Sequence, residues 1–216
     1  MRWLMALDTT GEQGSLALLR DGKVIDEVRL QSSEGFGAVV FDAIESMWAR
    51  HKLTPEEIDC YAGATGPGSF TGVRTGLTII KGLGEATGRP VVGVSNLRAM
   101  ASFGTGALRG VLLDARRGEI FGAVYDAGLR CVQDEVVIRI ADWVAGLPAG
   151  ELEFVAQDFA PFTLPAGLKV VAPRALAAAA GQIAWNEFAA GRATDAAALD
   201  ANYVRRADAE LQWKEM

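Results

Sequence analysis

Histidine and cysteine are scarce in this chain of 216 residues, which has one histidine, His51, and two cysteines, Cys60 and Cys131. Because zinc sites are built mainly from clusters of these residue types, the sequence offers no such ligand set for a metal. The two cysteines lack CxxC spacing, and we expect both thiols to be buried and reduced. A lone histidine also argues against a hydrolase, since His51 would have to be the only imidazole base.

Long apolar runs and an excess of positive charge are also missing. No apolar run reaches the roughly 18 residues of a membrane-spanning helix, and the short N-terminal apolar stretch meets a charge at Asp8, too early for a signal peptide. We therefore expect a cytoplasmic protein with no membrane partner. The net charge is −6, so the chain as a whole will not attract a nucleic acid electrostatically.

The chain does contain enough apolar sequence for a large core, since half of its residues are hydrophobic. Hydrophobic periodicity and turn residues predict the element order βββαβαβα for the first half and βββαββα for the second. The expected elements of the first half are strands 1–8, 15–20 and 23–30, helix 36–51, strand 58–64, helix 70–86, strand 91–94 and helix 95–103. Those of the second half are strands 110–114, 119–126 and 129–138, helix 142–146, strands 152–156 and 168–171, and helix 174–190.

The second half of the sequence resembles a diverged repeat of the first. Gly22 follows Asp8, and Gly128 follows Asp114, at the same offset of 14 residues. A matching acidic strand end and hairpin turn indicate a duplication. We predict a two-lobed α/β fold, with an N-terminal lobe at 1–105, a C-terminal lobe at 106–199, and a tail at 200–216 that returns to the first lobe.

A glycine-rich junction at 66–76 is the least ordinary part of the sequence. It lies between a predicted strand and a predicted helix, and Ser69 is well placed to cap that helix. A phosphate-binding loop is the alternative, but the P-loop Gly-Lys-Ser/Thr is missing, and Thr71 stands where a dinucleotide fingerprint needs glycine or alanine. Ser69 as a nucleophile is the weaker alternative to Ser69 as a cap.

The helix after this junction carries several glycines, among them Gly72, Gly76, Gly82 and Gly84. Each interior glycine costs about 1 kcal/mol relative to alanine, so close approach by another backbone is expected in compensation. That backbone belongs either to this chain or to a partner, and the sequence leaves both alternatives open.

The segment 66–77, GPGSFTGVRTGL, resembles the signature of the TsaB (YeaZ) family. Four further segments resemble that family in the expected order, at 7–10, 94–97, 114–119 and 203–205. The resemblance implies an actin-like/sugar-kinase/Hsp70 (ASKHA) fold with duplicated βββαβαβα lobes. It also implies a role in making N6-threonylcarbamoyladenosine at position 37 of the tRNAs that read ANN codons.

On this resemblance the chain is a non-catalytic scaffold or dimerisation subunit that activates a TsaD-like catalytic subunit. A TsaE-like ATPase joins the complex, tRNA is met only through it, and the chain alone forms a homodimer. No cofactor, catalytic residue or metal ligand is expected in this chain. We expect the partner surface on the two helices 36–51 and 70–86, at Val40, Ile44, Met47, Phe70, Val73, Arg74, Gly76, Leu77, Ile80 and Lys81.

The alternative function is a small ASKHA-type ATPase or kinase that binds ATP between the lobes. A vestigial nucleotide site there would use Asp8, Thr9, Thr10, Asp114, Arg116 and Arg117. Against it, the second half has no glycine pair before its last helix, where such folds hold adenosine. We favour the simpler interpretation that Asp8 and Asp114 cap turns by accepting hydrogen bonds from backbone amides.

Overall fold

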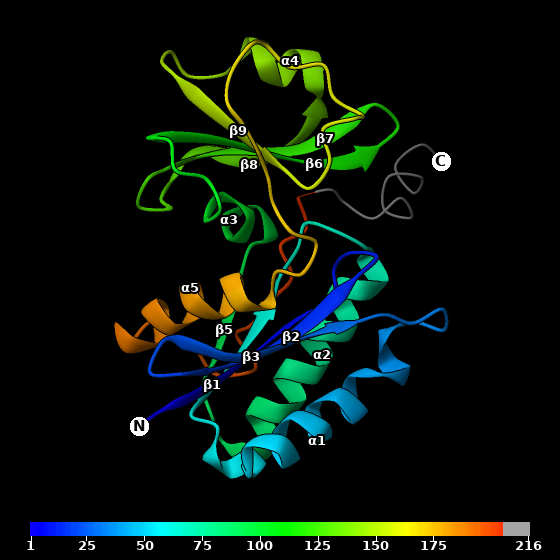
Figure 1. The fold of residues 1–216 in the computed structure, drawn as a ribbon, viewed down its shortest axis with the longest axis vertical. Helices are drawn as coiled ribbons and strands as arrows, with labels where there is room; N and C mark the ends of the chain where they lie inside the picture. The colour runs from blue at the N-terminus through cyan, green and yellow to red at the C-terminus, as the bar shows by residue number, and fades with distance from the viewer. Residues whose placement is uncertain (205–216) are drawn as a thin grey trace. The chain divides into compact units, whose positions relative to one another are not determined.

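The computed structural model describes residues 1–204, which form two compact units, each built on a five-stranded sheet (Figure 1). Unit 1 comprises Met1–Met100 and Pro173–Ala201, and unit 2 comprises Ala101–Ala172 with the described residues after 201. Within residues 1–204, no helix combines the length and apolar character that a bilayer span requires.

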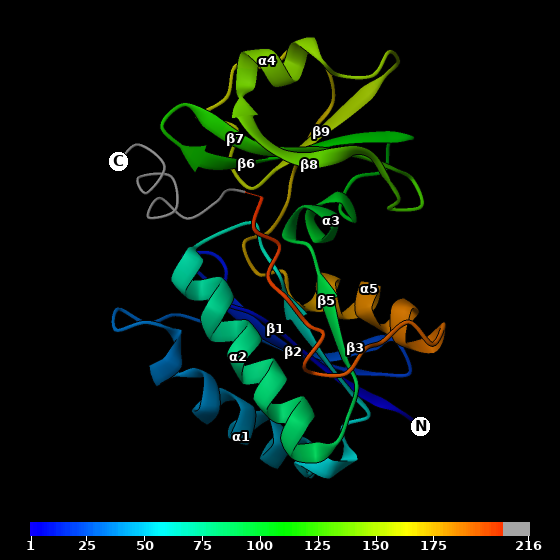
Figure 2. The same ribbon diagram turned by 180° about the vertical axis from the view of Figure 1, so that it is seen from behind.

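The sheet of unit 1 has the strand order β3-β2-β1-β4-β5, in which β1, β2 and β3 are antiparallel and β4 and β5 run parallel to β1. Helices α1 and α2 cover one face and α5 covers the other (Figures 1 and 2). The strands are β1 (Trp3–Asp8), β2 (Gly14–Arg20), β3 (Lys23–Leu30), β4 (Cys60–Ala64) and β5 (Val91–Val94). The helices are η1 (Phe36–Ala38), α1 (Val40–His51), η2 (Pro55–Glu57), α2 (Phe70–Thr87), α3 (Asn96–Ala101) and α5 (Ala177–Ala189).

The sheet of unit 2 repeats this topology, because its order β8-β7-β6-β9-β10 corresponds strand for strand to β3-β2-β1-β4-β5. Its own small core is centred on Trp143, which is 1% exposed. The predicted α/β class and duplicated lobe are therefore confirmed. The elements are β6 (Leu108–Arg116), β7 (Glu119–Asp126), β8 (Cys131–Arg139), α4 (Ile140–Ala145), β9 (Leu152–Ala156) and β10 (Lys169–Val171).

The predicted lobe boundaries are wrong at their C-terminal end. Residues 173–199 were expected in the second lobe, but Pro173–Ala201 belong to unit 1 because α5 packs on its sheet. A Cβ at Gly181 of α5 would lie 2.5 Å from Leu19 Cδ1, so the helix backbone lies directly on β2. Of the predicted tail 200–216, residues 200 and 201 lie in unit 1, residues 202–204 lie in unit 2, where Asn202 donates to Glu135, and residues 205–216 lie outside the described residues.

Several local predictions can be compared with the structure. Both residues of the Asp21–Gly22 turn have positive φ (48° and 79°), as a two-residue hairpin turn requires. The Ser95 hydroxyl accepts from the amides of Leu97 and Arg98 at the start of the predicted helix 95–103. The predicted helix 36–51 is a 3-10 turn followed by α1.

The two cysteines differ. Burial raises the pKa of the Cys60 thiol to about 12, in line with the predicted buried thiol. Cys131 is exposed, because it begins the edge strand β8, so its predicted burial is wrong.

A buried polar network fixes the glycine junction to the end of β1. Asp8, 1% exposed, accepts from the amide (2.9 Å) and the hydroxyl (2.6 Å) of Thr10. Asn96 donates to the Thr10 hydroxyl and accepts from the amide of Gly66 (3.0 Å). The end of β1, the glycine junction and the start of α3 are therefore held together in the interior of unit 1.

The glycines of α2 mostly make room for this chain and not for a partner. The Thr9 hydroxyl donates to the carbonyl of Gly72 (2.7 Å), and a Cβ at Gly72 would overlap the Thr9 carbonyl oxygen. A Cβ at Gly76 would lie 2.5 Å from Thr9 Oγ1, and one at Gly84 would lie 2.6 Å from Val91 Cγ1. Only Gly82 among these four has nothing within 4 Å. The alternative of packing within the chain is therefore the one that the structure shows.

Two alanine substitutions on α2 test this assignment. Gly72→Ala should lower the free energy of unfolding by about 2–3 kcal/mol, because the new Cβ meets backbone and not a yielding side chain. Gly82→Ala, the matched control, should raise it by about 1 kcal/mol, because open space surrounds that position. Urea denaturation measures both, and equal effects of the two substitutions would show that Gly72 is not closely packed.

The Asp8 carboxyl predicts a pH dependence of stability. Burial raises its pKa above 3.8, although hydrogen bonds from Thr10 and Asn96 oppose the shift. The folded protein binds the Asp8 proton more tightly than the unfolded chain does. As the pH rises from the pKa of Asp8 in the unfolded chain to its higher pKa in the folded protein, the contribution of Asp8 to the free energy of unfolding therefore falls. Asp8→Asn keeps an acceptor for Thr10 and should abolish that fall. Urea denaturation from pH 4 upward tests this, and identical pH profiles for both proteins would contradict it.

Candidate partner-binding face on α1 and α2

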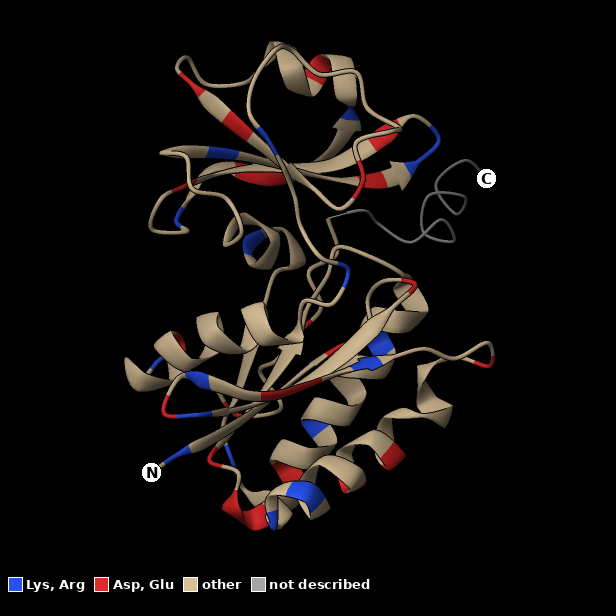
Figure 3. Ribbon diagram, viewed as in Figure 1, with Lys and Arg blue, Asp and Glu red and all other residues tan. Residues whose placement is uncertain are grey.

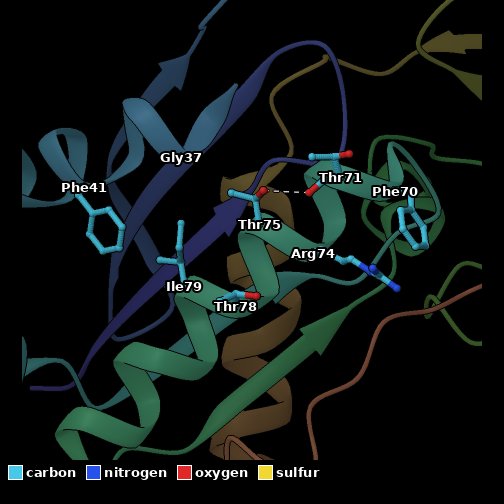
Figure 4. A pocket seen from close by; sticks show the side chains of 8 residues that line it. All are labelled: Gly37, Phe41, Phe70, Thr71, Arg74, Thr75, Thr78 and Ile79. Atoms are coloured by element: carbon cyan, nitrogen blue, oxygen red, sulfur yellow. Dashed lines mark hydrogen bonds between the residues drawn. The ribbon is translucent and has the colours of Figure 1, made fainter. Parts of the chain in front are cut away.

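The outer side of α1 and α2 carries an open groove of about 530 Å³ (Figure 4). Its floor and walls come from the start of α1, the turn before it, and the first half of α2. The lining residues are Gly37, Phe41, Phe70, Thr71, Arg74, Thr75, Thr78 and Ile79.

Two exposed aromatic rings mark this groove. Phe41 is 53% exposed and Phe70 is 42% exposed, although large apolar side chains are normally buried. The Arg74 guanidinium lies over the Phe70 ring, 3.9 Å from its centroid. Exposed aromatic rings beside a cation are typical of protein-binding surfaces, where aromatic and arginine side chains are enriched.

A stripe of threonines gives the groove its polar component. Thr71, Thr75 and Thr78 lie along one side of α2, and the Thr75 hydroxyl donates to the Thr71 carbonyl (2.9 Å) (Figure 4). Small hydroxyl side chains let another helix approach closely. The groove therefore combines apolar anchors, small polar groups and one positive charge, and none of its residues is a general acid, general base or metal ligand.

Most of the predicted interface residues face the core instead. The buried ones share the helix stripe that packs on the sheet; they are Val40, Ile44, Met47, Val73, Gly76, Leu77 and Ile80. Their prediction as surface residues is wrong, because the 3.6-residue apolar period identifies the side of a helix that faces its own core. Half-buried Lys81 donates to the carbonyl of Leu199 (2.8 Å), so its ammonium holds the segment after α5.

Phe70 and Arg74 are the two predicted interface residues that line the groove. Phe41 and the threonines were missed by the sequence analysis. Phe41 did carry a signal, since it lies outside the apolar period of α1 and is still a large aromatic residue. The threonines carried none, because exposed threonine is common on any helix.

The predicted cleft residues serve local structure. Asp114 accepts from the amide of Arg116 (2.8 Å), as Asp8 does from Thr10, so the favoured interpretation of both as turn caps is confirmed. Asp8 and Asp114 lie in different units, and their meeting across a cleft stays a prediction. The Thr9 and Thr10 hydroxyls donate within unit 1, and Asp8 is buried. These groups therefore do not fit the triphosphate and metal that the fold class implies.

The remaining candidate catalytic residues, Ser69 and His51, form contacts that serve the local structure. Ser69 accepts from the amide of Gly72 (3.3 Å) as the cap of α2, as predicted. His51 Nε2 lies 2.8 Å from Asp26 Oδ2; burial would raise the pKa of Asp26, but the hydrogen bonds from Arg50 and His51 lower it. Among the described residues, no group of three or more His, Cys, Asp or Glu side chains could hold a metal.

Comparison with known proteins places the chain in a family. The family model TsaD, tRNA N6-adenosine threonylcarbamoyltransferase, matches residues 31–215. The tRNA threonylcarbamoyladenosine biosynthesis protein TsaB of Bacillus subtilis is 30% identical over 146 residues, which are 65% of this chain and 64% of that protein. The tRNA N6-adenosine threonylcarbamoyltransferase of Thermus thermophilus is 27% identical over 197 residues, 76% of this chain and 60% of that protein.

A solved structure supports the fold. YeaZ from Pseudomonas aeruginosa superposes with a TM-score of 0.83 at 22% identity, covering 94% of this chain and all of that one. The chain spans less than two thirds of the length of the curated relatives named above. The family model nevertheless covers well over half of the chain. The chain therefore belongs to the family of the TsaD tRNA N6-adenosine threonylcarbamoyltransferase model, and within that family it is similar to TsaB of Bacillus subtilis.

Proposed function

We propose that this chain is the non-catalytic, partner-binding subunit of the machinery that installs N6-threonylcarbamoyladenosine at position 37 of tRNAs that read ANN codons. It holds a TsaD-like catalytic subunit in its active form, and a TsaE-like ATPase acts in the same complex. The observation that carries the proposal is the open groove with exposed Phe41 and Phe70 on a member of this family.

The chemistry of the groove fits a protein partner better than a small substrate. It is open, its two aromatic rings are half-exposed, and its polar groups are hydroxyls and one guanidinium. A helix with small and apolar side chains could lie between Phe41 and the threonine stripe, and a carboxylate on its rim could reach Arg74. A specific interface of this kind should bury at least about 1,000 Å² in total.

The family relation supports a particular occupant. The model that matches this chain is named for a transferase, so this chain and a TsaD-like subunit share a common fold. Two homologous chains can join through equivalent helix pairs in a pseudo-symmetric contact. When the catalytic subunit is absent, this chain pairs with a second copy of itself through the same groove.

A bulky substitution in the groove tests the proposal. Thr78→Trp should abolish co-elution with the TsaD-like subunit on a sizing column, because the indole fills the space between the two helices. Thr78 is exposed, so the substitution should leave the melting temperature within about 2 °C, as for other surface changes of about 0.5 kcal/mol. Ala86→Trp, on an exposed position of α2 outside the groove, is the matched control and should co-elute normally. Co-elution of Thr78→Trp at wild-type yield would remove the groove from the interface.

The alternative function, a small ATPase or kinase, is tested by calorimetry. Titration of the isolated chain with ATP and Mg²⁺ should give no micromolar binding, because the Thr9 and Thr10 hydroxyls already donate within unit 1. Micromolar binding that disappears in Asp8→Ala would instead favour the enzyme, provided that circular dichroism shows the variant to be folded.

A further inference from the structure

The hairpin that joins β6 and β7 ends in two adjacent arginines. Arg116 pairs with Glu119 in the strand register, which leaves Arg117 and Gly118 as a two-residue loop. In Figure 3 the ribbon at the tip of this hairpin has the blue of Lys and Arg, and its strands carry segments in the red of Asp and Glu. The Arg116 side chain is 77% exposed, and Arg117 is exposed as well.

The backbone of this turn suits other residues better than arginine. Arg116, Arg117 and Gly118 have φ values of 66°, 56° and 76°, so three successive residues are left-handed. Asparagine and glycine are preferred in two-residue loops of this kind, and a long side chain there is strained. Residues held in such conformations are concentrated at functional sites. Turn formation alone therefore does not account for two arginines here.

The turn is also held rigidly. Asp114 accepts from the amide of Arg116 (2.8 Å), and Ala115 is buried at a break in the strand register between Asp114 and Arg116. A break of this kind re-aims the side chains that follow it. The Asp114 carboxylate lies 3.9 Å from the Arg116 guanidinium, and an ion pair of this length and exposure adds little to stability.

We propose that the turn Asp114–Glu119 is a contact for the phosphate backbone of an RNA, and this inference rests on the function proposed above. The planar guanidinium donates two parallel hydrogen bonds to a phosphate, and two adjacent arginines can engage neighbouring phosphates. With a net charge of −6, the chain as a whole does not attract RNA, so the turn orients an RNA held by the complex and does not capture it alone. Phosphate contacts of this kind fix the register and orientation of a nucleic acid.

The structure suggests a substitution that removes the charge and keeps the fold. Arg116→Asn/Arg117→Asn places a residue that tolerates left-handed φ at both positions, so the melting temperature should stay equal or rise. The assay is fluorescence anisotropy of labelled tRNA with the complex of this chain and the TsaD-like subunit, across a series of KCl concentrations. The slope of log affinity against log salt should fall by about one for each phosphate that an arginine no longer neutralises.

Two further variants make the result specific. Arg116→Lys/Arg117→Lys keeps both charges and should retain most of the salt slope. Arg130→Asn removes an exposed arginine from the other hairpin turn of unit 2, between β7 and β8, and should leave the slope unchanged. An asparagine double variant that binds tRNA with the wild-type affinity and slope would overturn the inference.

The outcomes separate this inference from the proposed function. If the asparagine variant loses co-elution with the catalytic subunit instead of tRNA affinity, the turn binds an acidic protein surface and the RNA contact is refuted. If the wild-type chain itself does not co-elute, the proposed function fails, and the inference, which rests on that function, fails with it. If the complex forms and binds tRNA but the asparagine variant keeps the wild-type salt slope, the inference alone fails.

Discussion

The contact between Thr9 and the glycine face of α2 determines the orientation of that helix. The Thr9 hydroxyl donates to the carbonyl of Gly72, and a side chain at Gly72 or Gly76 would collide with Thr9. Because the helix can approach the end of β1 only along this face, its opposite side, with Arg74 and the threonines, is turned to solvent. The groove therefore depends on the contact between Thr9 and the opposite side of α2. Gly72 and Gly76 determine which side of the helix faces solvent, although neither of them lines the groove.

The strand-end polar groups of unit 1 serve the same purpose. Asp8, Thr10 and Asn96 bind one another and the amide of Gly66. A buried network in which every member has a partner makes a segment rigid. The glycine junction and the first turn of α2 are therefore held in one position, which reduces the entropy that a partner must remove when it binds the adjacent groove.

Much of the fold could be predicted from the sequence, because local rules act at the residues concerned. The Asp21–Gly22 pair predicted the hairpin between β2 and β3, and Ser69 predicted the cap of α2. The repeated element order predicted that the two sheets have the same topology. The location of α5 could not be predicted, since an alanine-rich helix fits either sheet. The exposed side of α2 was misassigned for a related reason: glycines show that a backbone comes close, but not whose backbone, and the apolar period marks the core side. Phe41 could have been recognised as an aromatic residue outside that period.

Hydroxyl-radical footprinting of the chain, free and bound to the TsaD-like subunit, tests the central claim most directly because it reports on individual side chains. The account predicts that Phe41 and Phe70, which are exposed in the free chain, are oxidised readily there and become protected in the complex. Leu168 and Val171, exposed on unit 2, should be oxidised equally in both. Unchanged oxidation of Phe41 and Phe70 together with protection of Leu168 and Val171 would contradict it, and would place the partner on the edge of the second sheet.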